Sequence, residues 1–243
     1  PPEAMSRSSV PVVCVLSIQH PEIIRKQLAD QGVAAAAKFP ERVRTLAGLR
    51  CLHLHFSEVV GKDLDRPNIQ AILIGGRSRL LRPDRDPEFF PLIRNTKIPI
   101  IGFCGGMQLI GKAYSAKVTS MRKLREGETD PNPKYHPGLF KEWGFLTVQI
   151  TRRDPLFESL PDRILVREAH AFHVPRAPAE FEVLAATAEC PVEAFKHRQR
   201  LLYGTQFHPE AYDDKHPQGK VILENFLRLA GIPAKPPVTP QRQ

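Results

Sequence analysis

The sequence predicts an α/β fold: a mostly parallel central sheet flanked by helices on both faces, with additional antiparallel strands. Three observations indicate this class. In the first half, short apolar runs alternate with helical stretches, as in a parallel sheet covered on both sides. In the second half, apolar runs follow one another across short connections, which favours antiparallel strands. The chain has 243 residues, 42% hydrophobic and 25% charged, as expected of a globular protein with a sizeable core.

Apolar runs too short to form helices mark the strands of the first half. They are rich in Val, Ile and Leu, which is typical of buried strands. Helical stretches lie between them, and an Ala-rich segment separates the first two. The predicted strands cover residues 10–18, 51–56, 71–74 and 98–101, and the predicted helices cover residues 23–28, 40–49 and 88–95, with a further helix beginning at 107.

The second half of the chain changes character. Residues 122–142 are polar and contain several prolines and glycines, which predicts an irregular excursion. Residues 219–229 (GKVILENFLRL) predict an amphipathic helix. The strands predicted between these two segments cover residues 145–150, 164–166, 181–186, 192–195 and 201–207.

The chain is expected to form one domain between two tails. Residues 1–9 are polar and predict a disordered N-terminal tail. Residues 233–243 are rich in proline and predict a C-terminal tail that ends the fold. Because no internal repeat or linker divides the sequence between them, we expect a single domain over residues 10–232.

A cysteine lies at the sharpest predicted turn. The strand at 98–101 runs into residues 102–106 (GFCGG), and an apolar helical pattern follows. A strand, a glycine-flanked turn and a helix form a nucleophile elbow, here with Cys104 in the position of the nucleophile. The glycines leave room for a strained backbone, and the N–H groups at the start of the helix favour a thiolate. A buried structural cysteine is the alternative interpretation.

A histidine that could serve this cysteine lies about 100 residues downstream. His208 follows the predicted strand at 201–207 and could take the thiol proton and later protonate a leaving amine. Glu210 is two residues further on, across a proline that restrains the segment. It could accept the imidazole N–H and hold the ring in one orientation, the third role of a catalytic triad.

Together these segments resemble the class I (triad) glutamine amidotransferases. Residues 102–108 (GFCGGMQ) match that family's G-x-C-x-G-x-Q motif, and residues 203–210 (YGTQFHPE) match its Y-G-x-Q-F-H-P-E motif. Shorter matches lie in the expected order between about residues 71 and 229. The resemblance implies a flavodoxin-like, glutamine amidotransferase-like fold. The shorter matches are residues 142–144 (EWG) and 154–157 (DPLF), Gly219, and residues 225–226 (NF).

The resemblance also implies a role for each matched position. The cysteine would attack the side-chain amide of glutamine and give a thioester and ammonia, and two backbone N–H groups would hold the oxyanion. The implied catalytic residues are Cys104, His208 and Glu210, the implied oxyanion donors are Gly76 and Gly105, and the implied substrate-binding residues are Gly75 and Gln108.

Two segments depart from the family pattern. Arg77 follows the glycine pair where the family usually has proline, so this turn is expected to lack proline's rigidity. In the family's H-x-D-x-V loop, Phe172 stands in place of Asp, between His170 and His173. These two histidines could lie near the site or serve only to pack the loop.

The sequence does not predict a metal or a cofactor. Cys51, His53 and His55 alternate and could share one face of a strand as ligands, but no fourth ligand is evident and a buried strand with polar tips is the favoured interpretation. The spacing of the four cysteines indicates neither a zinc site nor a disulfide framework.

The charge pattern narrows the classes of partner. The net charge is +9, but the basic residues are scattered and no aromatic-interleaved basic motif appears, so nucleic-acid binding is not expected. No apolar run approaches the roughly 20 residues of a membrane span. A catalytic thiol fits a reducing compartment, and we expect the cytoplasm, with a targeting segment before residue 1 left open.

Three functions are compatible with these features. The first is a glutamine amidotransferase (glutaminase) that supplies ammonia to a separate synthetase or acceptor subunit. The second is a stand-alone hydrolase that uses the same triad on γ-glutamyl amides or peptides, which the altered glycine turn motivates. The third is a non-catalytic binding module that keeps the fold.

Overall fold

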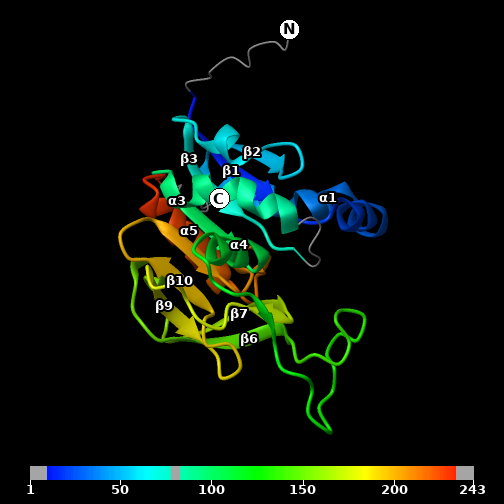
Figure 1. The fold of residues 1–243 in the computed structure, drawn as a ribbon. Coiled ribbons are helices and arrows are strands. Elements are labelled where there is room, and N and C mark those ends of the chain that lie inside the picture. The colour runs from blue at the N-terminus through cyan, green and yellow to red at the C-terminus, as the bar shows by residue number, and fades with distance from the viewer. Residues whose placement is uncertain (1–9, 78–82, 234–243) are drawn as a thin grey trace, which may run out of the picture.

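A computed structural model describes residues 10–77 and 83–233, which form a nine-stranded sheet with helices on both faces and a separate two-stranded sheet (Figure 1). From one edge to the other, the strands of the large sheet are β2 (Arg50–His55), β1 (Val12–Ser17), β3 (Ile69–Ile74), β4 (Ile100–Phe103), β11 (Leu202–Thr205), β10 (Ala194–His197), β9 (Phe181–Ala186), β6 (Glu142–Ile150) and β7 (Arg163–His170).

The sheet changes from parallel to antiparallel pairing at β11. Strands β2, β1, β3, β4 and β11 are all parallel, in the doubly wound order that the resemblance implied. Strands β10, β9, β6 and β7 extend it by antiparallel pairing. The predicted fold class is confirmed, including the antiparallel additions.

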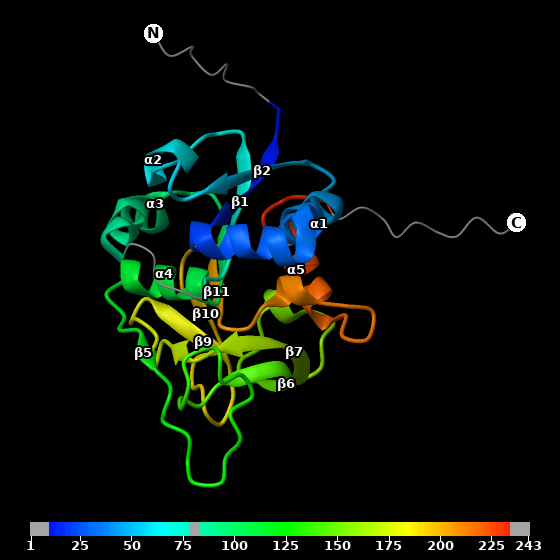
Figure 2. The same cartoon turned by 90° about the vertical axis from the view of Figure 1, so that its right-hand side faces the viewer.

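Helices cover the two faces of the parallel half. On one face α1 (Pro21–Ala47) packs against α5 (Gln218–Leu229), as Figure 2 shows. On the other face α3 (Phe90–Asn95) packs between α2 (Gly61–Leu64) and α4 (Gly105–Ala113). Successive residues of β1 point to opposite faces, so the buried Val13 and Val15 join the first core, while Cys14 and Leu16 join the second.

Helix α1 is longer than the sequence prediction. It is one helix of 27 residues, whereas two helices separated by an Ala-rich segment were predicted. That prediction is wrong because alanine has the highest helix propensity, so the segment continues the helix. The helix contains Pro40 and ends at Gly48, whose φ of 64° is the left-handed conformation typical of a helix C-cap.

The excursion between α4 and β6 is irregular, as predicted. It leaves α4 through β5 (Thr119–Ser120), which pairs with β8 (Phe172–His173), and a single bridge joins Lys123 to Leu139. In Figure 1 this green segment projects away from the large sheet. Three short 3-10 segments cover Pro83–Phe89, Pro155–Phe157 and Pro209–Ala211.

Two sequence predictions fall partly or wholly outside the described residues. The expected disordered tail at residues 1–9 and residues 234–243 of the expected C-terminal tail both lie there. Among the described residues, no helix is both long enough and apolar enough to cross a membrane.

Candidate active site

Cys104 occupies a strained turn between β4 and α4. Its φ of 49° and ψ of −104° lie where residues other than glycine are rare. Two glycines make the turn possible: a Cβ on Gly102 would lie 2.4 Å from the backbone of Gly106, and a Cβ on Gly106 would lie 2.4 Å from the carbonyl oxygen of Ile74. The predicted strand, turn and helix are therefore confirmed, and the fold presents Cys104 at the carboxyl end of β4.

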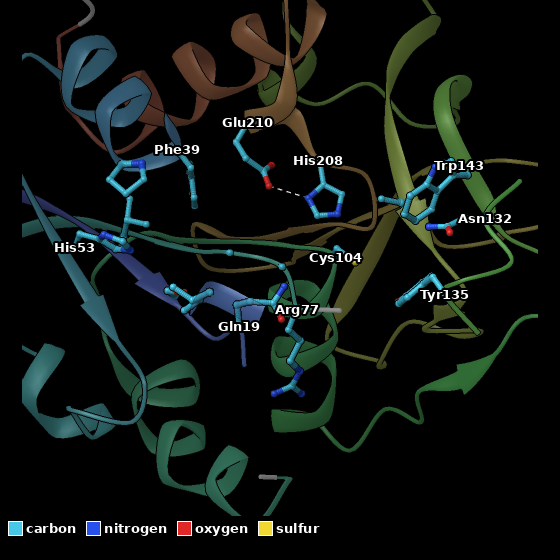
Figure 3. A pocket seen from close by; sticks show the side chains of 17 residues that line it. Gln19, Phe39, His53, Arg77, Cys104, Asn132, Tyr135, Trp143, His208 and Glu210 are labelled. Atoms are coloured by element: carbon cyan, nitrogen blue, oxygen red, sulfur yellow. Dashed lines mark hydrogen bonds and ion pairs between the residues drawn. The ribbon is translucent and has the colours of Figure 1, made fainter. Parts of the chain in front are cut away.

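His208 and Glu210 lie beside this cysteine. The backbone N–H of His208 donates to the carbonyl of Arg167 over 2.8 Å, which fixes the residue at the end of the β11 segment. Its Nδ1 lies 2.7 Å from Oε1 of Glu210. Figure 3 shows the His208 ring between the Glu210 carboxylate and Cys104. The structure thus brings together the three residues that the sequence singled out.

The surroundings of His208 favour its charged form. Burial disfavours the imidazolium, but the charge of Glu210 and the hydrogen bonds to Cys104 and Glu210 outweigh it and hold the pKa of His208 well above 6.5. The arrangement therefore provides a proton donor next to the sulfur at neutral pH.

Gln206 also contacts the sulfur, a contact that the sequence did not predict. Its side-chain Nε2 donates to Sγ of Cys104 over 3.4 Å, and its backbone N–H donates to the carbonyl of Glu193 over 2.7 Å. Its side chain is fully buried. The motif at 203–210 contains this glutamine, but only the fold shows that its amide reaches the cysteine.

Gln108, expected to bind substrate, is held by protein groups in this structure. Its Nε2 donates to the carbonyl of Phe172 over 3.0 Å and to Oε1 of Gln206 over 3.3 Å. Gln108 is not among the residues that line the cavity at Cys104. Its contacts instead orient the Gln206 amide, because an oxygen that accepts from Gln108 leaves the nitrogen to face the sulfur.

The two glycines of the predicted oxyanion turn have different surroundings. The N–H of Gly75 donates to the carbonyl of Leu16 over 3.0 Å, which ties the turn to β1. A Cβ on Gly76 would lie 2.7 Å from the His208 ring and 3.5 Å from the Cβ of Cys104. Gly76 therefore has to be glycine for His208 to approach the cysteine.

Arg77 stiffens the turn where proline is absent. Its guanidinium binds both carboxylate oxygens of Asp86, over 2.7 and 2.8 Å, and Lys112 of α4 binds Asp86 over 3.0 Å. A Cβ on Gly105, the other expected oxyanion donor, would lie 2.8 Å from the backbone nitrogen of Arg77. The expectation that this turn lacks restraint is wrong, because a buried ion pair replaces the proline ring.

A cavity of about 540 Å³ opens onto Cys104, His208 and the glycine pair. Figure 3 shows that its side chains come from two sides. Gln19, Phe39 and His53 come from the N-terminal part of the chain, and Asn132, Tyr135 and Trp143 come from the excursion and β6. Of the candidate metal ligands Cys51, His53 and His55, only His53 lines the cavity, and the side chains of Cys51 and His55 make other hydrogen bonds.

The excursion is organised so that it reaches the cavity. The buried ammonium of Lys141 binds both oxygens of Asp130, over 2.8 and 2.9 Å, and Asp130 also accepts the backbone N–H groups of Asn132 and Gly138. Burial, with the charge of Cys104, raises the pKa of the nearby Tyr135 to about 12. The sequence gave no signal for this wall, because polar loop residues resemble one another until their contacts are known.

Helix α1 braces the turn that carries Glu210. The guanidinium of Arg42 donates to the carbonyl of Glu210 and, over 2.6 Å, to that of Tyr212. It also lies 4.0 Å from the centre of the Tyr212 ring. A single side chain therefore connects the N-terminal part of the chain to the segment that positions His208.

Comparison with known proteins places these residues in a family context. A model of the family "Glutamine amidotransferase class-I" matches residues 55–230. The chain is 32% identical over 166 residues to a subunit of the glutamine-hydrolyzing GMP synthase of Methanococcus vannielii, covering 68% of this chain and 76% of the relative. It is 31% identical over 170 residues to the corresponding subunit from Pyrococcus abyssi, covering 70% and 80%.

Solved structures share the fold. A GMP synthase subunit-like protein from Thermoplasma acidophilum superposes with a TM-score of 0.66 at 21% identity, covering 90% of this chain and 94% of the other. A glutamine amidotransferase from Thermotoga maritima superposes with a TM-score of 0.54 at 22% identity, covering 90% of both chains. At these identities the likeness concerns the architecture.

Proposed function

Because the chain belongs to the class I glutamine amidotransferase family, we propose that it cleaves the side-chain amide of glutamine through a cysteinyl thioester and passes the ammonia to a separate synthetase subunit. The observation that carries this proposal is the placement of Cys104, on a strained elbow, next to a His208 that Glu210 holds at 2.7 Å.

The proposed reaction uses each of these groups in turn. The thiolate of Cys104, paired with the His208 imidazolium, attacks the amide carbon, and the backbone N–H groups of Gly76 and Gly105 stabilise the oxyanion. One such donor is typically worth about 3–4 kcal/mol of barrier. His208 then gives its proton to the leaving nitrogen, and ammonia departs. Water, activated by His208, hydrolyses the thioester and releases glutamate.

Two substrate-binding roles also belong to the proposal. Gly75 shapes the turn along which glutamine lies, although its own N–H is already bonded to Leu16. Gln108 supports the site through Gln206 and would bind glutamine directly only by exchanging its bond to the Phe172 carbonyl.

The names of the relatives suggest the acceptor of the ammonia. The curated relatives belong to a glutamine-hydrolyzing GMP synthase made of more than one chain, so the first candidate partner is a separate GMP synthase subunit. We place the reaction in the cytoplasm, because a reducing compartment keeps the Cys104 thiol reactive.

Ammonia release from glutamine tests the proposal. The wild type is expected to release ammonia, faster when the partner that co-purifies from the source cell is present. Cys104→Ala should reduce the rate at least about 1,000-fold, and Cys14→Ser, in a buried cysteine of β1, should leave it unchanged. Equal rates for wild type and Cys104→Ala would contradict the proposal.

A second candidate is hydrolysis of larger γ-glutamyl amides or peptides. The cavity volume favours it: about 540 Å³ lies in the range of roughly 300–1,000 Å³ that suits drug-sized ligands, and Tyr135 and Trp143 offer aromatic surface to a leaving group. A panel of γ-glutamyl compounds separates the two candidates. If glutamine has the highest kcat/KM, the second candidate is excluded. Labelling of Cys104 by a glutamine-like electrophile at neutral pH would exclude a non-catalytic module.

A further inference from the structure

A second group of reactive side chains lies inside the antiparallel half of the sheet. Glu142 begins β6 and pairs across the ladder with His170, the last residue of β7. Glu193 directly precedes β10, and Cys190 lies in the turn before it. Each of the four is at most 5% exposed, and none of them lines the cavity at Cys104.

These side chains converge on one imidazole nitrogen. Nε2 of His170 lies 3.1 Å from Oε2 of Glu142, 3.7 Å from Oε1 of Glu193 and 3.3 Å from Oε2 of Glu168, which is also buried. One ligand atom from each of Glu142, His170, Cys190 and Glu193 lies within 4.8 Å of all the others.

Many polar atoms of this group have no hydrogen-bond partner. They are Nε2 of His170, Oε2 of Glu142 and both carboxylate oxygens of Glu168 and of Glu193. Glu168 and Glu193 are 0% exposed, so water does not reach them. Buried carboxylates without partners are costly unless a cation is present. Among the described residues, the ion pairs of these three glutamates are made with His170 alone.

The orientation of His170 is that of a metal ligand. Its Nδ1 faces the carbonyl of Phe172 at 3.2 Å, which makes Nδ1 the protonated nitrogen in the neutral ring. Nε2 then directs its lone pair toward the carboxylates. A histidine that donates from one nitrogen to a backbone carbonyl and ligates through the other is the usual arrangement at protein metal sites.

We propose that Glu142, His170, Cys190 and Glu193 bind one divalent transition-metal ion of the zinc type. Zinc bonds of about 2.0–2.3 Å in a tetrahedron place ligand atoms roughly 3.3–3.8 Å apart, and the His170 distances to Glu142 and Glu193 lie close to that range. Imidazole, thiolate and carboxylate together suit zinc, cobalt or iron and not calcium or magnesium. The Sγ of Cys190, which donates to the Val192 carbonyl over 3.6 Å, gives up its proton on binding.

The ion would have a structural role. With four protein ligands and no face toward the cavity, the site has no open position for a substrate. It joins β6, β7 and the β9–β10 turn. It also lies behind Cys104, because the carbonyl of Glu193 accepts the Gln206 backbone N–H, and the Phe172 carbonyl that faces His170 also accepts from Gln108. This inference does not depend on the proposed reaction.

The test uses Co²⁺ as a spectroscopic probe. The full chain is expressed in zinc-depleted medium with Co²⁺, purified under reducing conditions and examined by elemental analysis and absorption. We expect about one Co²⁺ per chain, as a structural four-ligand site holds a single ion, together with a thiolate-to-cobalt charge-transfer band. Cys190→Ser should abolish the band. Cys14→Ser, in a second fully buried cysteine, should retain it.

A second pair of variants separates metal binding from folding. Glu193→Gln should lower metal content at least about 10-fold, as expected for loss of a ligand, and Glu168→Gln should lower it less. The circular dichroism spectrum reports whether each variant is folded. Wild-type protein that holds no divalent ion, or a band that persists in Cys190→Ser, would overturn the proposal and indicate that shared protons hold the carboxylates together.

Discussion

The side-chain amide of Gln206 donates a hydrogen bond to the sulfur of Cys104, and Gln108 fixes the direction of that amide. The two glutamines come from segments almost 100 residues apart, on α4 and after β11. The sulfur therefore has a neutral donor in Gln206 in addition to the charged donor His208. A thiolate gains from both.

Replacing Gln206 should weaken the proposed chemical step. Gln206→Met keeps the length of the side chain but removes the donor. A hydrogen bond to a charged group is worth about 1.5–3 kcal/mol, so kcat should fall roughly 10- to 100-fold. KM should change little, because Gln206 is buried and does not line the cavity. Steady-state glutaminase assays measure both constants, and an unchanged kcat would show that the contact is unimportant.

The glycine pair offers a matched test of close packing at the site. In Gly76→Ala the new methyl group would lie 2.7 Å from the His208 ring and push it from its position. A displacement of this kind can cost about 100-fold in rate. In Gly75→Ala the methyl group would lie 3.6 Å from the Phe39 ring, an ordinary contact, so activity should be largely kept. Equal activity of the two variants would argue against this account.

Glu210 should control the charge of His208. In the wild type the pKa of His208 is raised well above 6.5, so the imidazolium persists at neutral pH and is lost only as the pH rises through the raised value. Glu210→Gln removes the carboxylate, and the pKa of His208 should fall. NMR titration of the His208 ring measures this directly, and the alkaline limb of the kcat/KM profile should move to lower pH with it. A pKa that stays in place would assign the raised value to another group.

Arg122 should control how well the excursion forms its wall of the cavity. Its guanidinium binds Glu128 over 2.7 Å and Glu189 over 2.7 Å, which anchors the segment that carries Asn132 and Tyr135. Arg122→Gln should raise KM several-fold and leave kcat nearly unchanged. Lys123→Gln removes an equal charge from an exposed neighbour and serves as the control. A KM that rises equally in both variants would indicate a general effect of charge.

The Arg77–Asp86 pair should stabilise the fold. The two side chains are 4% and 3% exposed, so Asp86→Asn would leave a buried guanidinium without its carboxylate. Removing one partner of a buried pair typically costs about 3–5 kcal/mol, which denaturant unfolding can measure. Burial disfavours the Asp86 carboxylate, but Arg77 and Lys112 outweigh it and lower its pKa below 3.8. The contribution to stability is therefore present above pH 3.8 and is lost as the pH falls through the lowered value; an Asp86→Asn variant as stable as wild type would contradict it.

The parts of the site that the sequence predicts are local. The elbow needs residues 102–106 in a row, and His208 and Glu210 are two residues apart, so short patterns suffice. The parallel strands were predictable because strands buried on both faces are uninterrupted apolar runs.

The remaining features depend on contacts between distant residues. Tyr135 reaches the cavity only because Lys141 and Asp130 shape the excursion, and Gln206 meets Cys104 only because β4 and β11 are neighbours. The ligands proposed for the metal come from three separate segments, with no spacing that a sequence pattern would reveal. Arg77 departed from the family pattern, and its compensating partner Asp86 became visible only in the fold.

The brace formed by Arg42 has a consequence for how the protein can be shortened. Arg42 precedes the segment matched by the family model, which begins at residue 55, and so does β1, which lies between β2 and β3. A gene fragment limited to residues 55–230 would encode Cys104, His208 and Glu210, yet it would expose one edge of β3 and release the Glu210 turn from α1. The unit that evolution and the laboratory must keep intact is therefore longer than the segment by which the family is recognised.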